Sequence, residues 1–258
     1  MYLAIDYTSP EDRRGKTRHR PPKRRKDKGK MNILCVSDTT QSLAFSPNVK
    51  EIYKDTDIIL SCGDMPVESY DYLSTMLRRD VFYVYGNHNL STFKYEMDRE
   101  YRHFMKFEND FTKKFYGFMV DGKCMIHKRT GLIIAGLGGS MLYNDGDSQY
   151  TEAKMKWRIR RLVPTLLRNK RKYGRYLDIL ITHAPPRGIG DGEDQCHKGF
   201  ECFLSFMDRF KPKYLLHGHV HLTDLNSQRV TQYNDTKVIN VFGSYMIKEE
   251  EIGAQIGR

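Results

Sequence analysis

Five short apolar runs in this chain each end in a small group of polar residues, and no other feature of the sequence constrains the fold as strongly. The runs are rich in Ile, Leu and Val and too short for typical helices, so they indicate buried strands. The groups that follow them are 37–40, 61–64, 86–89, 182–186 and 217–221, and they are rich in Asp, Asn and His. Because sites in α/β sheets gather at the carboxyl ends of strands, we expect these groups to meet in one crevice.

The chain as a whole predicts an alternating α/β protein with one large domain at 31–258. Its 258 residues are ample for a sizeable buried core. Alternating segments at 228–233 and 237–241 suit antiparallel strands near the end. Apolar runs predict strands at 33–36, 57–60, 81–85, 132–135, 177–181 and 214–216, and helical stretches fill 70–78 and 200–210.

Most of the positive charge lies in a tail at 1–30. This tail holds 11 Lys and Arg against four acids, which leaves only +4 of the formal net charge of +11 for the rest of the chain. With two adjacent prolines and almost nothing apolar to bury, the tail is expected to be disordered. It could contact nucleic acid, an anionic membrane surface or an import receptor, or be a solvated extension. Met31 directly precedes a strand and would make an ordinary start codon.

A second basic segment, at 154–175, lies largely within a helix expected over 151–172. Met155 and Leu162 share one face of that helix, and basic residues take the others. We expect Pro164 to break or kink the helix, because proline removes a backbone donor and clashes with the preceding turn. A basic amphipathic helix can bind phosphate backbones or membranes, and the alternative is a solvated face on a packed helix.

Composition excludes several classes of protein. A mean hydropathy of −0.65 and the lack of an apolar run of membrane-spanning length predict no transmembrane helix. The first thirty residues are charged, so no secretory signal is expected. Five cysteines, with no paired short spacing, argue against a disulfide framework or a Cys-only zinc site and are interpreted as small buried residues. We therefore expect a cytoplasmic protein.

The polar groups at the strand ends carry the types of side chain that bind metal ions. Carboxylate, amide and imidazole ligands suit divalent ions such as Mn, Fe or Zn. Gly63-Asp64 by itself is more often a turn than a metal site. His219 and His221 alternate along an expected extended segment and would therefore share one side of it.

In their order along the chain these groups resemble the motifs of the calcineurin-like metallophosphoesterases: D-x-H, G-D, G-N-H-[DE], a lone His and G-H-x-H. The match runs from residue 33 to 221, and the stretches 149–152 and 182–186 look most like small bacterial members of that family. Four of the five blocks stand here as Gly63-Asp64, Gly86-Asn87-His88, His183 and Gly218-His219-Val220-His221. The resemblance implies a four-layer αββα sandwich, in which two mixed sheets are flanked by helices and the metal site lies at one edge.

The resemblance also implies a role for each residue of the site. Asp64 would bridge two divalent metal ions, and a water between them would lose its proton and attack phosphorus. His88 would donate a proton to the leaving group. The ligands would be Asp38 and His221 at the first metal, and Asn87, His183 and His219 at the second.

Two departures from the family pattern weaken this expectation. Thr40 stands where the family has the His of D-x-H, and a hydroxyl is a poor ligand beside imidazole. We therefore expect the first metal to bind weakly or to complete its shell with water. Asn89 replaces an acidic residue; its amide can orient His88 by a hydrogen bond but adds no charge to favour the imidazolium.

The loop at 190–200 follows the block that contains His183 and is expected to cap the site. Arg187, His197 and Lys198 would then contact the substrate phosphate. An ordinary acidic surface loop is the alternative.

The sequence therefore predicts a metal-dependent phosphoesterase acting on a phosphomonoester or a phosphodiester, with nucleotides among the candidates. The basic tail and the 154–175 segment add nucleic acid as a candidate partner. The competing prediction is a weakly active or inactive scaffold with the same fold, which would bind protein or RNA.

Overall fold

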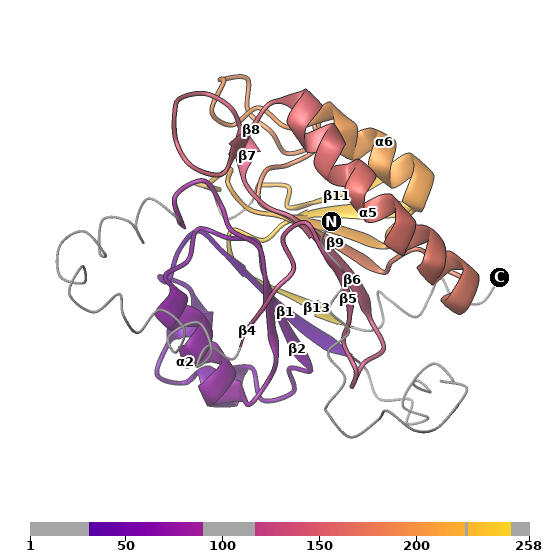
Figure 1. The fold of residues 1–258 in the computed structure, drawn as a ribbon. Coiled ribbons are helices and arrows are strands. Elements are labelled where there is room, and N and C mark those ends of the chain that lie inside the picture. The colour runs from indigo at the N-terminus through magenta and orange to yellow at the C-terminus, as the bar shows by residue number, and fades with distance from the viewer. Residues whose placement is uncertain (1–30, 90–116, 225–226, 249–258) are drawn as a thin grey trace, which may run out of the picture.

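A computed structural model describes residues 31–89, 117–224 and 227–248, so the predicted tail at 1–30 lies outside the described residues. Its first sheet has the strand order β13-β1-β2-β3-β4 (Figure 1). The strands from β1 to β4 run parallel, and β13 closes the edge antiparallel to β1. Their bounds are β1 Asn32–Ser37, β2 Ile58–Ser61, β3 Val81–Tyr83, β4 Gly117–Met119 and β13 Gly243–Lys248.

A second sheet has the order β11-β12-β10-β9-β6-β5. Its four central strands are parallel, and antiparallel strands stand at both edges. The bounds are β5 Cys124–Ile126, β6 Ile133–Leu137, β9 Ile179–Thr182, β10 Tyr214–His217, β11 Val230–Tyr233 and β12 Thr236–Asn240. A short parallel pair, β7 Ser140–Met141 and β8 Gln149–Tyr150, lies beyond β6 in the sequence.

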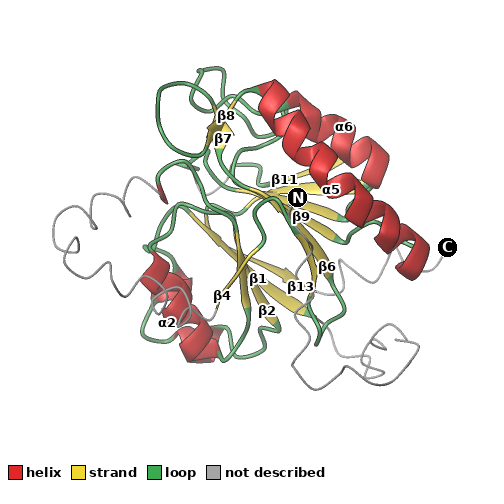
Figure 2. Ribbon diagram, viewed as in Figure 1, coloured by secondary structure: helices red, strands yellow, loops and turns green. Residues whose placement is uncertain are grey.

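Helices cover the outer face of each sheet (Figure 2). The 3-10 turn η1 (Leu43–Phe45) and the helices α1 (Val49–Ile52) and α2 (Val67–Leu77) contribute to the apolar cluster on the first sheet. On the second sheet, α5 (Glu152–Tyr173) and α6 (Glu201–Phe210) contribute to another.

The side chains of the strands alternate between these layers, which places the core. Ile33 and Cys35 of β1 join the cluster between the two sheets, whereas Leu34 and Val36 face the helices of the first sheet. In β9, Ile179 and Ile181 belong to the cluster between the sheets, and Leu180 packs toward α5 and α6. This period of two buries both faces of these central strands. The predicted four-layer αββα sandwich of mixed sheets is therefore confirmed.

All eight predicted strands and both predicted short helices are present, with ends within three residues of those expected. The antiparallel pairing of β11 with β12 is also confirmed. Five strands were not predicted, namely β4, β5, β7, β8 and β13. They have two to six residues and lack a long apolar run, so little in the sequence signals them.

The predicted break at Pro164 is wrong, because α5 continues through it for 22 residues. The carbonyl that loses its backbone partner belongs to Arg160, which is exposed like Pro164, so water can take the place of the missing donor. On the opposite side, Met155, Leu162 and Leu166 are buried against the second sheet. Burial of these three side chains outweighs a proline penalty of about 3 kcal/mol.

All five cysteines are free thiols, as the spacing predicted. Cys35, Cys62 and Cys202 are buried, but Cys124 and Cys196 are only partly so, which corrects the expectation that all five are buried. Within the described ranges, no helix has both the length and the apolar composition needed to cross a membrane.

Candidate metal centre

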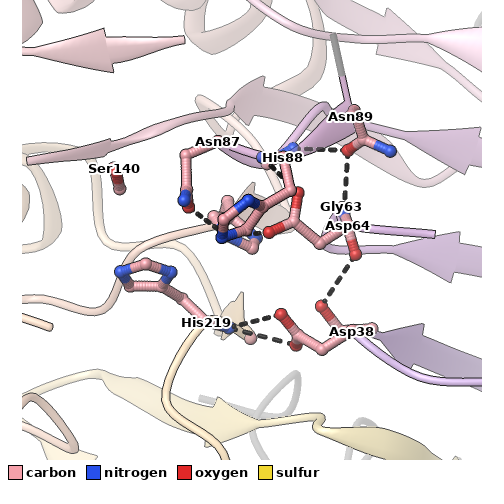
Figure 3. Close-up of polar contacts among 12 residues, drawn as sticks. Asp38, Gly63, Asp64, Asn87, His88, Asn89, Ser140 and His219 are labelled. Carbon is pink, nitrogen blue, oxygen red and sulfur yellow. Dashed lines mark hydrogen bonds and ion pairs between the residues drawn. The ribbon is translucent and has the colours of Figure 1, made fainter. Parts of the chain in front are cut away.

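Loops from both sheets converge on one cluster of polar side chains (Figure 3). Asp38, Asp64 and Asn87 follow β1, β2 and β3 of the first sheet. His183 and His219 follow β9 and β10 of the second. Parallel strands end at the same edge of a sheet, so the topology brings these five residues together, as the sequence predicted.

Three of these residues adopt a left-handed backbone conformation, with φ of 67° at Asp38, 52° at Asp64 and 67° at His219. This region is uncommon for residues other than glycine, although Asp and His adopt it more often than most. At His219 it turns the chain out of the extended conformation. His219 is 5% exposed, while the side chain of His221 is 63% exposed. The prediction that these two histidines share one side of a strand is therefore wrong.

Two glycines allow the loops to approach closely. A Cβ on Gly86 would collide with the carboxylate of Asp64 and lie 2.6 Å from Cε1 of His183. A Cβ on Gly218 would collide with Asp38 and lie 2.7 Å from Cβ of Ser37. The cluster can form only because these positions carry no side chain.

The deep half of the centre consists of Asp64, Asn87, His183 and His219. His183 is fully buried, and its Nε2 lies 3.1 Å from Oδ2 of Asp64 and 3.0 Å from Oδ1 of Asn87. Its Nδ1 lies 2.8 Å from the backbone carbonyl of Cys62, which can only accept a hydrogen bond. The carbonyl therefore orients the ring and directs Nε2 at the two oxygens.

The charges of the deep half are strongly coupled. Burial alone would lower the pKa of His183, but the negative charges of Asp64 and Asp38 outweigh it and raise that pKa to about 9. Burial would likewise raise the pKa of Asp64, yet its contact with His183 lowers that pKa to about 2. A proton therefore lies between the imidazole and the carboxylate, where positive charge is most favoured.

His219 is oriented by a backbone carbonyl in the same way. Its Nε2 donates to the carbonyl of Cys196 at 2.8 Å, which leaves Nδ1 as the free ligand atom. Its ring centre lies 4.8 Å from that of His183. Burial lowers the pKa of His219 to about 3, so its imidazole is neutral at pH 7 and available to an ion. Tyr143 supports the neighbouring ligand, because its hydroxyl accepts from Nδ2 of Asn87 at 3.0 Å.

The outer half consists of Asp38 and His221, with Thr40 two residues after Asp38 in the chain. The carboxylate of Asp38 is 2% exposed and accepts the backbone N–H of His219 at 3.1 Å on both oxygens. Burial raises the pKa of Asp38. Nε2 of His221 lies 4.0 Å from Oδ1 of Asp38, and its ring packs against Phe242. Thr40 is exposed. This half is therefore much less enclosed than the deep half.

The residues of the centre fit a divalent cation. Ligand atoms of Asp38, Asp64 and His183 all lie within 4.8 Å of one another. Two carboxylates, an amide oxygen and imidazoles with carbonyl-fixed tautomers form the mixed oxygen and nitrogen set that such ions prefer. The proton on His183 occupies a place where a cation would balance the same negative charge.

His88 and Asn89 lie beside the carboxylate of Asp64. The backbone N–H of His88 donates to Oδ1 of Asp64 at 2.9 Å, and its side chain is exposed. The Asn89 side chain accepts from the N–H groups of Gly86 and Asp64 and donates to the carbonyl of Met65. Asn89 therefore joins two loops of the site through their backbones, a role that the sequence did not predict.

The loop at 187–199 lies against the deep half through Cys196 and His197. The ring of His197 is 5.3 Å from that of His219, and its Nδ1 contacts Asp194 at 2.9 Å. Lys198 is half-buried in the same loop. Arg187 donates to Asp191 at 2.8 Å, so a substrate phosphate would compete with this carboxylate.

Sequence reasoning missed the groups that support the ligands. The carbonyls of Cys62 and Cys196 carry no side-chain signal. Tyr143 lies in the segment after β7, and its contact with Asn87 depends on the tertiary fold.

A comparison with models of protein families agrees with the fold and the candidate metal centre described above. The model of the calcineurin-like phosphoesterases matches residues 31–222, so the chain belongs to that family. Its members are metal-dependent hydrolases of phosphoesters, typically with two metal ions. The chain is also similar to the crystal structure of TT1561 of Thermus thermophilus, at 15% sequence identity and a TM-score of 0.48, over 83% of this chain and 89% of that one. No curated protein matches the chain.

Proposed function

We propose that this chain hydrolyses a phosphomonoester or a phosphodiester, with nucleotides among the candidate substrates, by means of the centre described above. One observation carries the proposal: Nε2 of the fully buried His183 lies 3.1 Å from Oδ2 of Asp64 and 3.0 Å from Oδ1 of Asn87. A structural cluster would not need an imidazole held by a carbonyl with its second nitrogen aimed at two oxygens.

Divalent ions such as Mn, Fe or Zn, held by the deep and outer halves, would activate a water and stabilise charge on the phosphoryl oxygens. Asp64 would serve both halves. Asn87, His183 and His219 would complete the deep position, and Asp38 and His221 the outer one. Because Thr40 supplies no imidazole and His221 is exposed, the outer ion would bind more weakly.

The chain's own groups would handle the proton and the substrate. The exposed imidazole of His88, anchored through its backbone at Asp64, would donate a proton to the departing oxygen. His197 and Lys198 would contact the phosphate from the loop beside His219. Arg187 would contact the phosphate only after its hydrogen bond to Asp191 had broken.

The exposure of Thr40 and His221 also favours a second candidate, a scaffold of the same fold with little activity that binds protein or RNA. A scaffold would bind one ion or none and would show no turnover that depends on Asp64.

Hydrolysis of bis-p-nitrophenyl phosphate and p-nitrophenyl phosphate with added Mn, together with metal content, tests the proposal. We expect turnover in the parent chain and its loss in Asp64→Ala. With phenyl phosphate as a further substrate, His88→Ala should slow its hydrolysis more than that of p-nitrophenyl phosphate. Phenol is the poorer leaving group and depends more on protonation. No turnover with at most one bound ion would favour the scaffold instead.

A further inference from the structure

The outward face of α5 carries an unusual density of positive charge. Eight of its basic residues are exposed: Lys154, Lys156, Arg160, Arg161, Arg168, Lys170, Arg171 and Lys172. The helix has a single acid, Glu152 in its first turn, which pairs with Lys156 at 3.6 Å. On the neighbouring α6, Asp208 is held by Tyr233 and Asn234. The exposed basic side chains of α5 therefore form a cationic strip in two groups, 154–161 and 168–172, with no basic residue at 162–167 between them.

The only tryptophan of the chain lies within this strip. Trp157 is 45% exposed, although a tryptophan usually buries most of its surface. Nζ of Lys154 lies 4.9 Å and Cζ of Arg161 lies 4.8 Å from the centre of its ring. An exposed aromatic ring between cations is the arrangement that binds an unpaired nucleobase and its flanking phosphates.

The packing of α5 distinguishes nucleic acid from a membrane as the partner. A helix that binds a lipid surface inserts its apolar face among the acyl chains. In α5 that face is buried against the second sheet through Met155, Leu162 and Leu166. The large apolar side chains exposed on the described helix are Trp157 and Leu167, which is too little for insertion.

We propose that the outward face of α5 is a binding surface for single-stranded nucleic acid. The basic side chains from Lys154 to Lys172 would contact the phosphates along about 27 Å of helix. One nucleobase would stack on the ring of Trp157 in place of Lys154 or Arg161. This proposal does not rest on the proposed hydrolysis, because binding needs neither metal nor turnover. It would nevertheless supply polyanionic phosphoesters to a protein of this family.

Fluorescence of Trp157 in the full chain tests the proposal directly, since no other tryptophan contributes. The protein is kept metal-free with EDTA, so that hydrolysis cannot interfere, and is titrated with an oligothymidylate of twelve nucleotides. We expect saturable quenching whose affinity falls steeply with salt. Absence of quenching, together with unchanged anisotropy of a dye-labelled oligonucleotide, would overturn the proposal. Binding of anionic phosphatidylserine vesicles with a blue shift, but not of the oligonucleotide, would overturn it in favour of a membrane.

Variants of exposed residues locate the binding surface. Arg161→Gln, Arg168→Gln and Arg171→Gln combined should weaken binding at least tenfold and lower the salt slope by about 2, because each contact with a phosphate of a single strand contributes about 0.7. Trp157→Ala, followed by anisotropy, should weaken it about tenfold. The matched control is Arg209→Gln with Lys211→Gln at the end of α6, which should leave the affinity unchanged. If the α5 variants bind as tightly as the parent chain, the surface lies elsewhere and the proposal fails.

Discussion

The deep and outer halves of the candidate metal centre lie side by side, yet they are built differently. In the deep half, the carbonyls of Cys62 and Cys196 orient the two imidazoles, and both histidines are buried. In the outer half, Asp38 is buried, but His221 is exposed and 4.0 Å away from it. From this difference we expect that a complete set of ligand types does not by itself make a tight metal site. The groups that hydrogen-bond to the ligand side chains decide how far those side chains must still be ordered when an ion binds.

The largest effect is expected from Gly86→Ala, which would break the deep half itself. The new Cβ would collide with Asp64 and His183, so we expect metal affinity and turnover to fall at least about 100-fold. Gly174→Ala is the matched control, because nothing lies within 4 Å of a Cβ at that helix end. It should reduce stability by about 1 kcal/mol without changing metal binding. Metal titration and thermal unfolding of both variants check this, and wild-type affinity in Gly86→Ala would contradict the packing described here.

A pair of histidine variants should separate the two halves. His183→Gln removes the imidazole at the centre of the deep half, so we expect the tightest ion to be lost, with affinity about 100-fold lower. His221→Gln should leave that ion in place and weaken only the second equivalent. Calorimetric titration with Mn measures both steps. Equal losses in the two variants would show that the halves do not differ in the way proposed.

The proton on His183 should give the deep half a characteristic pH dependence. Its pKa is raised from 6.5 to about 9, so this proton stabilises the metal-free fold fully below pH 6.5, and that contribution is lost as the pH rises through 9. An entering ion must displace the proton, so affinity should rise about tenfold per pH unit up to that pKa.

Titration at pH 7.5 in buffers of different ionisation enthalpy counts the protons released. Close to one proton is expected with the first equivalent of ion. Release of none would mean that His183 is neutral in the metal-free protein.

The smallest effect is expected from Thr40→His, which would repair the outer half. If position 40 belongs to the outer half, its imidazole would add a ligand to Asp38 and His221, and the second ion should bind about tenfold more tightly. Affinity for the first ion should not change. If the affinity for the second ion does not change, residue 40 does not belong to the outer half.

The sequence predicted the layout of the centre better than its organisation. Asp38, Asp64, Asn87, His183 and His219 were located because each follows an apolar strand, and strand ends converge by topology alone. The carbonyls behind the two imidazoles and the contact of Tyr143 with Asn87 join segments far apart in the chain, so no local pattern indicates them.

Local patterns also failed where the tertiary fold overrides them. A positive φ at His219 turns the chain and separates it from His221, although the spacing of the two residues suits one side of a strand. The same holds for α5, where the packing of its buried face keeps Pro164 within a continuous helix.

Titration of metal-free protein with Mn by calorimetry tests the central claim most directly. The account predicts one tight equivalent at the deep half, followed by a second that binds at least about tenfold more weakly. Two equivalents of equal affinity would contradict the inequality of the two halves, and no tight equivalent would contradict the deep half as a metal site.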